Sequence, residues 1–140
     1  EYFAISGATI NSLIPQELSM IKELPNVILL VYISDSEVKA LMIKCNAFIF
    51  PSYYEGFGIP PLEALSTGTK IIVSSSATLP EIFKSSAYYI DPFNTDVSLK
   101  DILSGTVSDS NEILDYYTYE NATELFLSEL KKICFIRQKQ

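Results

Sequence analysis

Residues 47–73, AFIFPSYYEGFGIPPLEALSTGTKIIV, give the clearest indication of fold in this chain. An apolar run, Ala47–Phe50, predicts a short strand, and Ile59–Ser66 predicts a helix that ends at Gly68. A second apolar run, Ile71–Val73, predicts the next strand. Apolar strands that alternate with helices are typical of a parallel sheet covered by helices on both faces.

The same alternation extends to both sides of this stretch. Upstream, we expect strands at Tyr2–Ser6 and Val27–Val31, a helix at Pro15–Leu24, and a further helix after Ser34–Glu37, which has the spacing of a capping box. Downstream, we expect helices at Pro80–Phe83, Val97–Leu103 and Tyr119–Ile133 (with Thr118 as N-cap), a strand at Tyr88–Ile90 and an exposed loop at Ser104–Asp115. The pattern predicts one Rossmann-like, doubly wound α/β domain over residues 1–140.

Composition excludes several classes of function. The chain has 140 residues, of which 48% are hydrophobic and 19% charged, as expected for a packed core. Its net charge of −7 disfavours nucleic acid and anionic membrane surfaces as partners. Because there is no His, a Ser-His-Asp triad, a Cys-His pair and a His-based metal site are all excluded. Cys45 and Cys134 are expected to be buried, reduced thiols of a cytosolic protein.

In a sheet of this kind, ligands bind beyond the carboxyl ends of the strands. The loops expected there are Gly7–Ser12, Tyr32–Asp35, Pro51–Gly58 and Ser74–Leu79. The third is the most informative, because Gly56 and Gly58 allow the backbone to turn tightly and to approach a ligand. Pro60 suits the first turn of the helix that follows. Free amides at that helix start would form a cradle for phosphate oxygens.

Two acids flank this cradle. Between Cys45 and Thr69, Glu55 and Glu63 are the only charged side chains. Glu63 lies in a helix that is apolar on nearly every side, so we expect it to be partly buried and hydrogen-bonded. Because a carboxylate repels a diphosphate, both acids suit neutral hydroxyls, such as a ribose diol and a second sugar. The alternative, in which Glu63 only favours the helix macrodipole as a first-turn acid, stays open.

At this point a family resemblance appears. The segment PSYYEGFGIPPLEALSTGT resembles the donor-site signature of family 4 of the retaining glycosyltransferases, which have the GT-B fold. Asn26–Val38 is similar to the strand and loop that meet the nucleotide base in that family. Leu79–Glu81, Asp91–Pro92 and Tyr117–Ala122 also resemble family segments, so that the resemblance covers roughly residues 2–133.

The resemblance implies a role for each matching residue. Glu55 would contact the donor sugar and be the catalytic-site acid, and Glu63 would bind the ribose hydroxyls. The other donor-binding positions are Gly56, Phe57, Gly58 and Ile59, whose backbone approaches the sugar and β-phosphate, and Tyr32 and Ile33 beside the base. Glu81 would be structural. The resemblance implies no metal ligand and no cofactor.

The chain also departs from the family pattern. Val31 stands where a Gly is common, and Lys84–Ser86 replaces a Gly-containing turn. The family uses an Arg and a Lys to neutralise the diphosphate, whereas this chain has no cation before Lys22 and has Arg137 as its only Arg. We therefore expect that this pair and the acceptor-binding N-terminal domain lie upstream, so that the chain alone is inactive.

The implied function is that of the C-terminal, donor-binding half of a hexosyltransferase. Its parent would move a hexose from a UDP- or GDP-sugar to a glycan or lipid-linked acceptor, with retention, in bacterial O-antigen, lipopolysaccharide or capsule synthesis. Its partners would be the donor, its own N-terminal domain and the acceptor, in the cytoplasm, with peripheral membrane association left open. Two alternatives stay open: a sugar-nucleotide epimerase, and a non-catalytic nucleotide-binding or interaction domain. Donor base, sugar, acceptor, linkage and oligomeric state are not determined by the sequence.

Overall fold

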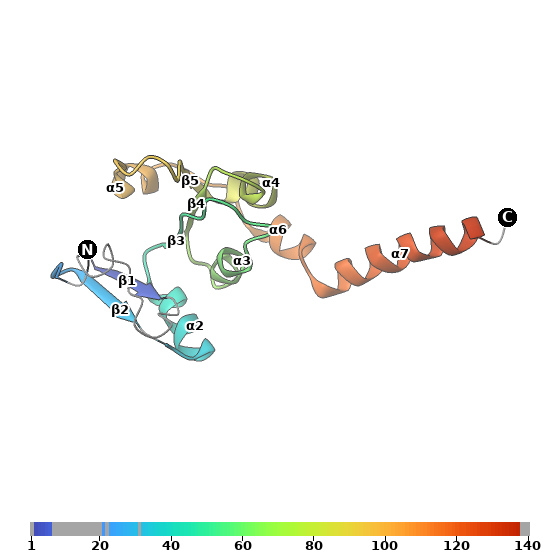
Figure 1. The fold of residues 1–140 in the computed structure, drawn as a ribbon, viewed down its shortest axis with the longest axis horizontal. Helices are drawn as coiled ribbons and strands as arrows, with labels where there is room; N and C mark the ends of the chain where they lie inside the picture. Colours follow the sequence, from blue (N-terminus) through green and yellow to red (C-terminus); the bar gives the residue numbers. More distant parts are fainter. Residues whose placement is uncertain (1, 7–20, 22, 31, 138–140) are drawn as a thin grey trace. The chain divides into compact units, whose positions relative to one another are not determined.

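The computed structural model describes residues 2–6, 21, 23–30 and 32–137 (Figure 1). The chain divides into two compact units, Glu1–Leu41 and Met42–Gln140. The loop expected at Gly7–Ser12 and most of the helix expected at Pro15–Leu24 lie outside the described residues. That residues 1–140 form a single domain stays a prediction.

The described part of the first unit contains two parallel strands. These are β1 (Phe3–Ser6) and β2 (Val27–Leu30), paired in register from Phe3 with Val27 to Ser6 with Leu30. Helix α2 (Asp35–Lys44) follows, and its start has the predicted capping contact. The Ser34 hydroxyl and amide donate to Glu37 Oε2 over 2.7 and 2.8 Å. These bonds lower the pKa of the Glu37 carboxyl, because they stabilise its charged form.

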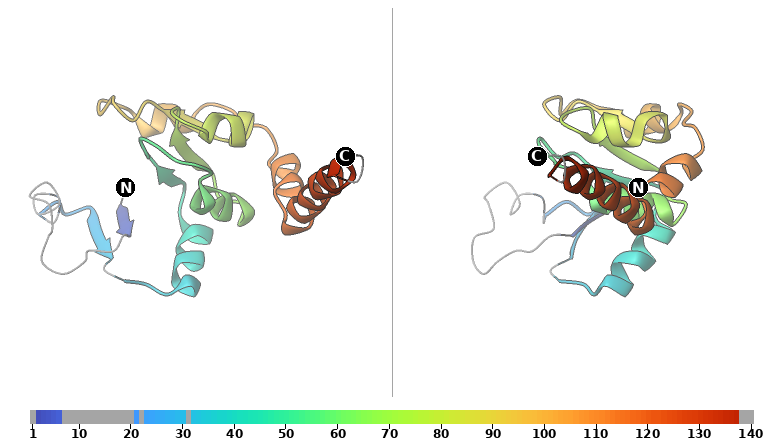
Figure 2. Two further views of the ribbon diagram at one scale, coloured as in Figure 1. Left: turned by 45° about the vertical axis from the view of Figure 1, so that its right-hand side comes forward. Right: turned by 90° about the vertical axis from the view of Figure 1, so that its right-hand side faces the viewer.

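The second unit is built on three parallel strands. These are β3 (Phe48–Phe50), β4 (Ile71–Ser74) and β5 (Tyr88–Ile90), in the order β3-β4-β5. Helix α3 (Ile59–Ser66) connects β3 to β4, and α4 (Leu79–Phe83) with the short helix η1 (Lys84–Ser86) connects β4 to β5. Figures 1 and 2 show α3 and α4 on opposite sides of these strands. The predicted α/β class with parallel strands is confirmed.

The core lies around the central strand. All four residues of β4 are buried, as its position between two strands and two helices requires. Leu79 and Phe83 on α4, and Ala64 on α3, are fully buried beside it. On the β5 side, Tyr88 and Ile90 pack with Ile72. This core holds the ends of β3 and β4 in place, and the loops that follow them contain the candidate site.

The C-terminal part contains three helices, α5 (Leu99–Leu103), α6 (Asn111–Tyr116) and α7 (Tyr119–Arg137). The prediction of a loop over Ser104–Asp115 is therefore wrong in its second half. Helix α6 forms because Asp109 Oδ1 accepts from the Asn111 amide over 3.0 Å and because Ile113 is buried. The predicted N-cap of α7 is confirmed, since the Asn121 amide donates to Thr118 Oγ1 over 3.1 Å.

Two further points concern the surface. The prediction of buried thiols is wrong, because Cys45 and Cys134 are both exposed and unpaired. Cys45 follows the last turn of α2, and Cys134 lies on α7, where described side chains face solvent. Apolar residues beside a cysteine in the sequence therefore do not imply that its thiol packs against apolar side chains in the fold.

None of the described helices combines the length and the apolar character that crossing a bilayer requires.

Candidate functional site

The candidate site centres on the β3–α3 loop, Pro51–Gly58, which leaves the carboxyl end of β3 and enters α3. Gly58 ends the loop with a φ of +86°. A Cβ at this position would lie 2.7 Å from Leu79 Cδ2, so the site requires glycine for both its conformation and its contact. Pro60 lies in the first turn of α3, as predicted, where a missing amide hydrogen removes no helix bond.

Two hydroxyl groups hold this loop. Ser52 Oγ donates to Glu55 Oε1 over 3.0 Å from within the loop itself. Thr78, at the start of α4, has its Oγ1 at 2.9 Å from Glu55 O and at 3.1 Å from Gly56 O. Neither hydroxyl was predicted to have a role from the sequence. Both follow a strand of the sheet, and that position is the signal that could have drawn attention to them.

The Glu55 residue is half-buried, and the hydrogen-bond partner of its carboxylate among the described residues is a neutral group, the Ser52 hydroxyl. Among the ion pairs of the described residues, none includes Glu55 or Glu63. No cation among the described residues therefore neutralises either carboxylate. A carboxylate in this state is a strong acceptor for ligand hydroxyls, as predicted for these two residues from their chemistry.

The expected partial burial of Glu63 is wrong, because its side chain is exposed. Helix α3 buries Pro61, Ala64 and Leu65, and this stripe turns Glu63 toward solvent. The alternative reading as a first-turn acid does not hold either, because the first turn of α3 contains no acid. Glu63 is thus an exposed acid in the second turn, and neither packing nor the helix dipole explains why an acid stands at this position.

Three of the predicted donor-site residues line one cavity. Phe57, Ile59 and Glu63 contribute to a cavity of about 560 Å³, and Glu55 lies outside it. The opposite wall comes from the end of α6 and the start of α7, and the Phe57 ring packs edge-on against Tyr117 with centroids 5.0 Å apart. The cavity is therefore mainly apolar and aromatic, and Glu63 is the one charged residue among those that line it. Of the two predicted acids, Glu63 therefore lines this cavity and Glu55 does not.

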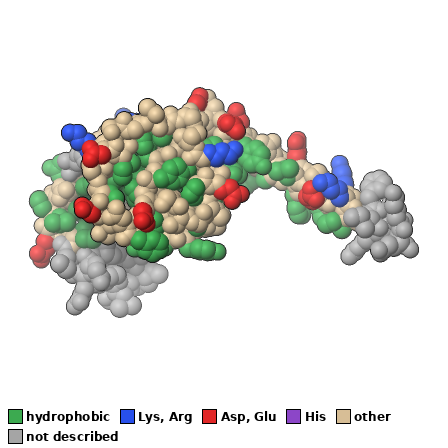
Figure 3. Space-filling model, turned by 90° about the horizontal axis from the view of Figure 1, so that it is seen from above, with side chains coloured by type: hydrophobic (Ala, Val, Ile, Leu, Met, Phe, Trp, Pro, Cys, Tyr) green, Lys and Arg blue, Asp and Glu red, His purple; other side chains and the backbone are tan. Residues whose placement is uncertain are grey.

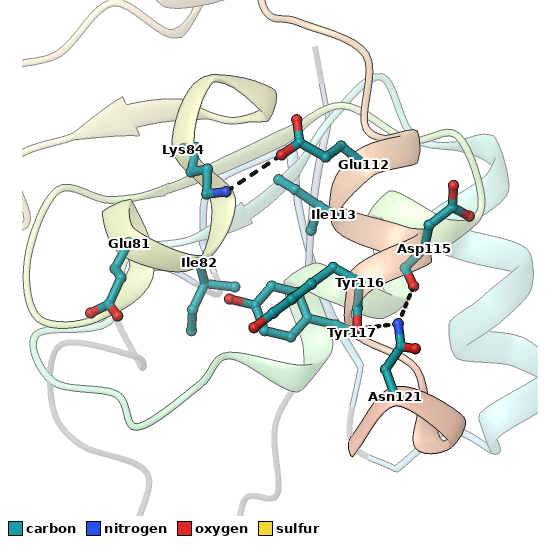
Figure 4. A pocket seen from close by; sticks show the side chains of 9 residues that line it. All are labelled: Glu81, Ile82, Lys84, Glu112, Ile113, Asp115, Tyr116, Tyr117 and Asn121. Atoms are coloured by element: carbon teal, nitrogen blue, oxygen red, sulfur yellow. Dashed lines mark hydrogen bonds and ion pairs between the residues drawn. The ribbon is translucent and has the colours of Figure 1, made fainter. Parts of the chain in front are cut away.

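A second cavity, of about 660 Å³, lies between α4 and α6 (Figure 4). Lys84 Nζ and Glu112 Oε1 lie 3.7 Å apart at its rim, and both side chains are exposed. Lys84 has a φ of +46°, at the turn where the resembling family has a glycine. Glu81 also lines this cavity, whereas none of the predicted donor-binding residues does. This cavity could not be predicted from the sequence, because a loop was expected in place of α6.

Tyr32 and Ile33 belong to the first unit and lie two and three positions after Leu30, the last residue of β2. Tyr32 is exposed and Ile33 is half-buried. Their role beside a nucleotide base stays a prediction. Within the described part of the chain, no three Cys, Asp or Glu side chains lie close enough together to hold a metal ion.

With this geometry in place, the fold can be compared with known proteins. The structure resembles that of sucrose-phosphate synthase from Thermosynechococcus elongatus with a TM-score of 0.63 and 20% identity, over 87% of this chain and 33% of that chain. The parallel α/β fold is thus that of a GT-B type glycosyltransferase domain. Residues 15–122 match the family described as "Glycosyl transferases group 1". The chain belongs to this family.

Curated relatives include bacterial mannosyltransferases. O-antigen chain mannosyltransferase B of Escherichia coli is 36% identical over 79 residues, which are 56% of this chain and 21% of that protein. O-antigen chain mannosyltransferase RfbU of Salmonella typhimurium is 33% identical over 98 residues, which are 66% of this chain and 28% of that protein. The chain therefore spans less than a third of the length of either relative.

Proposed function

We propose that this chain is the donor-binding part of a retaining, family 4 glycosyltransferase. Its parent moves mannose or a related hexose from a GDP- or UDP-sugar to a glycan or lipid-linked acceptor in bacterial O-antigen synthesis. The relatives named as O-antigen mannosyltransferases support the sugar and the pathway. The proposal extends to a cytoplasmic enzyme that needs no metal cofactor and receives its acceptor on an N-terminal domain of its own.

The observation that supports this function best is the conformation of the β3–α3 loop. It lies beyond the carboxyl end of a parallel strand, ends in a left-handed glycine, and leads into a helix start. Backbone amides at such a place bind phosphate oxygens well. A loop with this shape that also contains a carboxylate, Glu55, combines acceptors for sugar hydroxyls with donors for a diphosphate.

In the proposed reaction, an oxygen of the acceptor bonds to the anomeric carbon on the face that the diphosphate leaves. The bond between that carbon and the β-phosphate oxygen breaks, and the acceptor proton passes to the departing phosphate. Negative charge therefore grows on the diphosphate, where the amides near Gly58 stabilise it. Glu55 accepts hydrogen bonds from the hexose hydroxyls and orients the ring, and Glu63 does the same for the ribose.

The test measures sugar transfer by the complete protein and by its variants Glu55→Gln and Glu63→Gln. E55Q should lower kcat by about a hundredfold, because loss of orientation at the reacting sugar has effects of that size. E63Q should mainly raise KM for the sugar nucleotide, since its contact lies away from the reacting carbon. The assays use GDP-mannose, UDP-hexoses and their diphosphates.

Glu112 and Glu120 provide matched controls. They repeat the spacing of Glu55 and Glu63 outside the motif, and both are exposed. E112Q and E120Q should leave kcat and KM within about twofold, as expected for surface positions. Near-normal turnover of E55Q would contradict the assigned role, and failure of the complete protein to bind any sugar nucleotide would contradict the function itself.

A further inference from the structure

Thr78 occupies an unusual position for a helix-capping residue. It precedes α4, and its carbonyl oxygen accepts from the amides of Glu81 and Ile82 over 3.0 and 3.1 Å. A threonine here ordinarily also accepts a helix amide with its side-chain oxygen. In α4 no such side-chain bond is present. The hydroxyl turns away from its own helix and donates to the β3–α3 loop.

The hydroxyl reaches two successive carbonyl groups of that loop, Glu55 O at 2.9 Å and Gly56 O at 3.1 Å. Peptide groups are planar, and those described are trans, so each carbonyl points opposite to the amide of the next residue. Drawing these two carbonyls toward Thr78 therefore turns the amides of Gly56 and Phe57 away from α4. One side chain thus sets the direction of two adjacent N–H groups.

A second contact fixes the end of the same loop. Leu79, the residue after Thr78, is fully buried and packs against Gly58. This contact is possible because Gly58 has no Cβ. In addition, Ala77, the residue before Thr78, has a φ of +55°, a strained conformation for a residue with a Cβ. The loop before α4 is thus held in an unfavourable conformation that delivers Thr78 to the β3–α3 loop.

The amides that this arrangement directs have no acceptor among the described residues. No bond from the Gly56, Phe57, Gly58 or Ile59 amide to a described group is present. Successive N–H groups that lack an internal acceptor are available to bind an anion. Because their direction is set before the ligand arrives, binding does not have to order them.

We infer that Thr78 is a positioning residue for the donor diphosphate. Its hydroxyl holds the peptide groups at Glu55 and Gly56 so that the next two amides face the phosphate-bearing ligand. The inference rests on the proposed function, because it names the ligand those amides serve. Thr78 contacts no reacting atom and acts only through the loop.

The experiment compares Thr78→Val, which removes the hydroxyl at constant shape, with Thr78→Ser, which keeps it. In the complete protein, T78V should raise the dissociation constants of GDP or UDP and of the sugar nucleotide about tenfold, the equivalent of one lost hydrogen bond. T78S should restore binding to within about twofold of the wild type, a factor well inside the spread of a single hydrogen bond. T78A replaces T78V if the latter does not fold.

Thr67 supplies the matched control. It is also half-buried, and its hydroxyl donates to Ala64 O over 2.7 Å at the far end of α3. Thr67→Val should lower the thermal midpoint without changing nucleotide affinity, whereas T78V changes affinity. Equal affinity of T78V and the wild type would overturn the inference.

A readout without ligand separates this inference from the proposed function. In amide NMR spectra of the protein, T78V should shift the Gly56 and Phe57 resonances and accelerate their hydrogen exchange, while T78S should not. If the wild type binds no nucleotide, the proposed function fails, and these two amides still report whether Thr78 holds the loop. Unchanged Gly56 and Phe57 signals in T78V would show that it does not.

Discussion

At the residue scale, the two left-handed glycines of the second unit differ in one respect. Gly58 and Gly68 have φ values of +86° and +80°, so an L side chain is strained at either position. A Cβ on Gly68 meets nothing within 4 Å, whereas a Cβ on Gly58 meets Leu79 Cδ2 at 2.7 Å. Alanine at each of the two positions therefore separates the destabilisation caused by a left-handed backbone from that caused by the added contact with Leu79.

We expect Gly68→Ala to lower the free energy of unfolding by about 1 kcal/mol, from the left-handed backbone alone. Gly58→Ala should lower it by about 3 kcal/mol, because the added methyl group also displaces the buried Leu79. Urea unfolding of both variants, followed by circular dichroism, measures the difference. Equal losses would mean that α4 moves aside freely, which would also weaken the view that the β3–α3 loop is fixed against it.

The same scale shows where sequence reasoning about the site reaches its limit. The loop glycines and Pro60 could be predicted, because backbone requirements select those residue types directly. The exposure of Glu63 could not, because α3 is apolar at most positions and only the packed structure shows which stripe faces the sheet. The contacts of Thr78 join segments more than twenty residues apart, and local patterns contain no information about such pairs.

At the element scale, apolar strands were predicted well and short polar helices were not. β3, β4 and β5 are runs of buried or half-buried residues bounded by turns, and α3 has both a start and a stop signal. Helix α6 has six residues and a single buried side chain, Ile113, so it has no helical period to detect. Its stability comes from tertiary packing against the second unit's core.

Helix α7 is the element with the least support from packing. Its side chains from 122 to 134 are all exposed, including Phe126, Leu130 and Ile133. Figure 3 shows hydrophobic side chains beside acidic and basic ones toward the right, where Figure 1 places α7. Helices gain most of their stability from tertiary packing, so a helix of 19 residues without it is only marginally stable.

We therefore expect amide hydrogen exchange in residues 124–134 to be much faster than in β4, whose four residues are buried. Exchange measured by mass spectrometry on the protein alone gives this comparison, with α3 as an internal reference of intermediate burial. Protection of α7 equal to that of β4 would contradict this expectation and would indicate that a second copy of the chain covers its apolar side chains in solution.

At the scale of the whole molecule, the distribution of burial separates the two units. Every buried hydrophobic side chain among the described residues lies between Met42 and Ile113. The second unit therefore contains its own core, and the last residues of α2, from Met42 onward, belong to this unit. Met42 is buried, and its carbonyl oxygen accepts a hydrogen bond from the Thr69 hydroxyl.

This distribution predicts that a chain beginning at Ser34 folds by itself. Ser34 is the right starting point because its hydroxyl and amide cap α2 through Glu37, so the helix keeps its N-terminal contacts and Met42 keeps its place. Removal of residues 1–33 should leave cooperative unfolding and slow exchange in β4 intact, because none of the described residues removed has a buried side chain. Beginning instead at Asn46 removes α2 with Met42 and should lower the unfolding free energy by about 2–4 kcal/mol, the effect of losing one buried large side chain. Loss of β4 protection in the chain that begins at Ser34 would show that the first unit contributes to the core and that the two units fold as one.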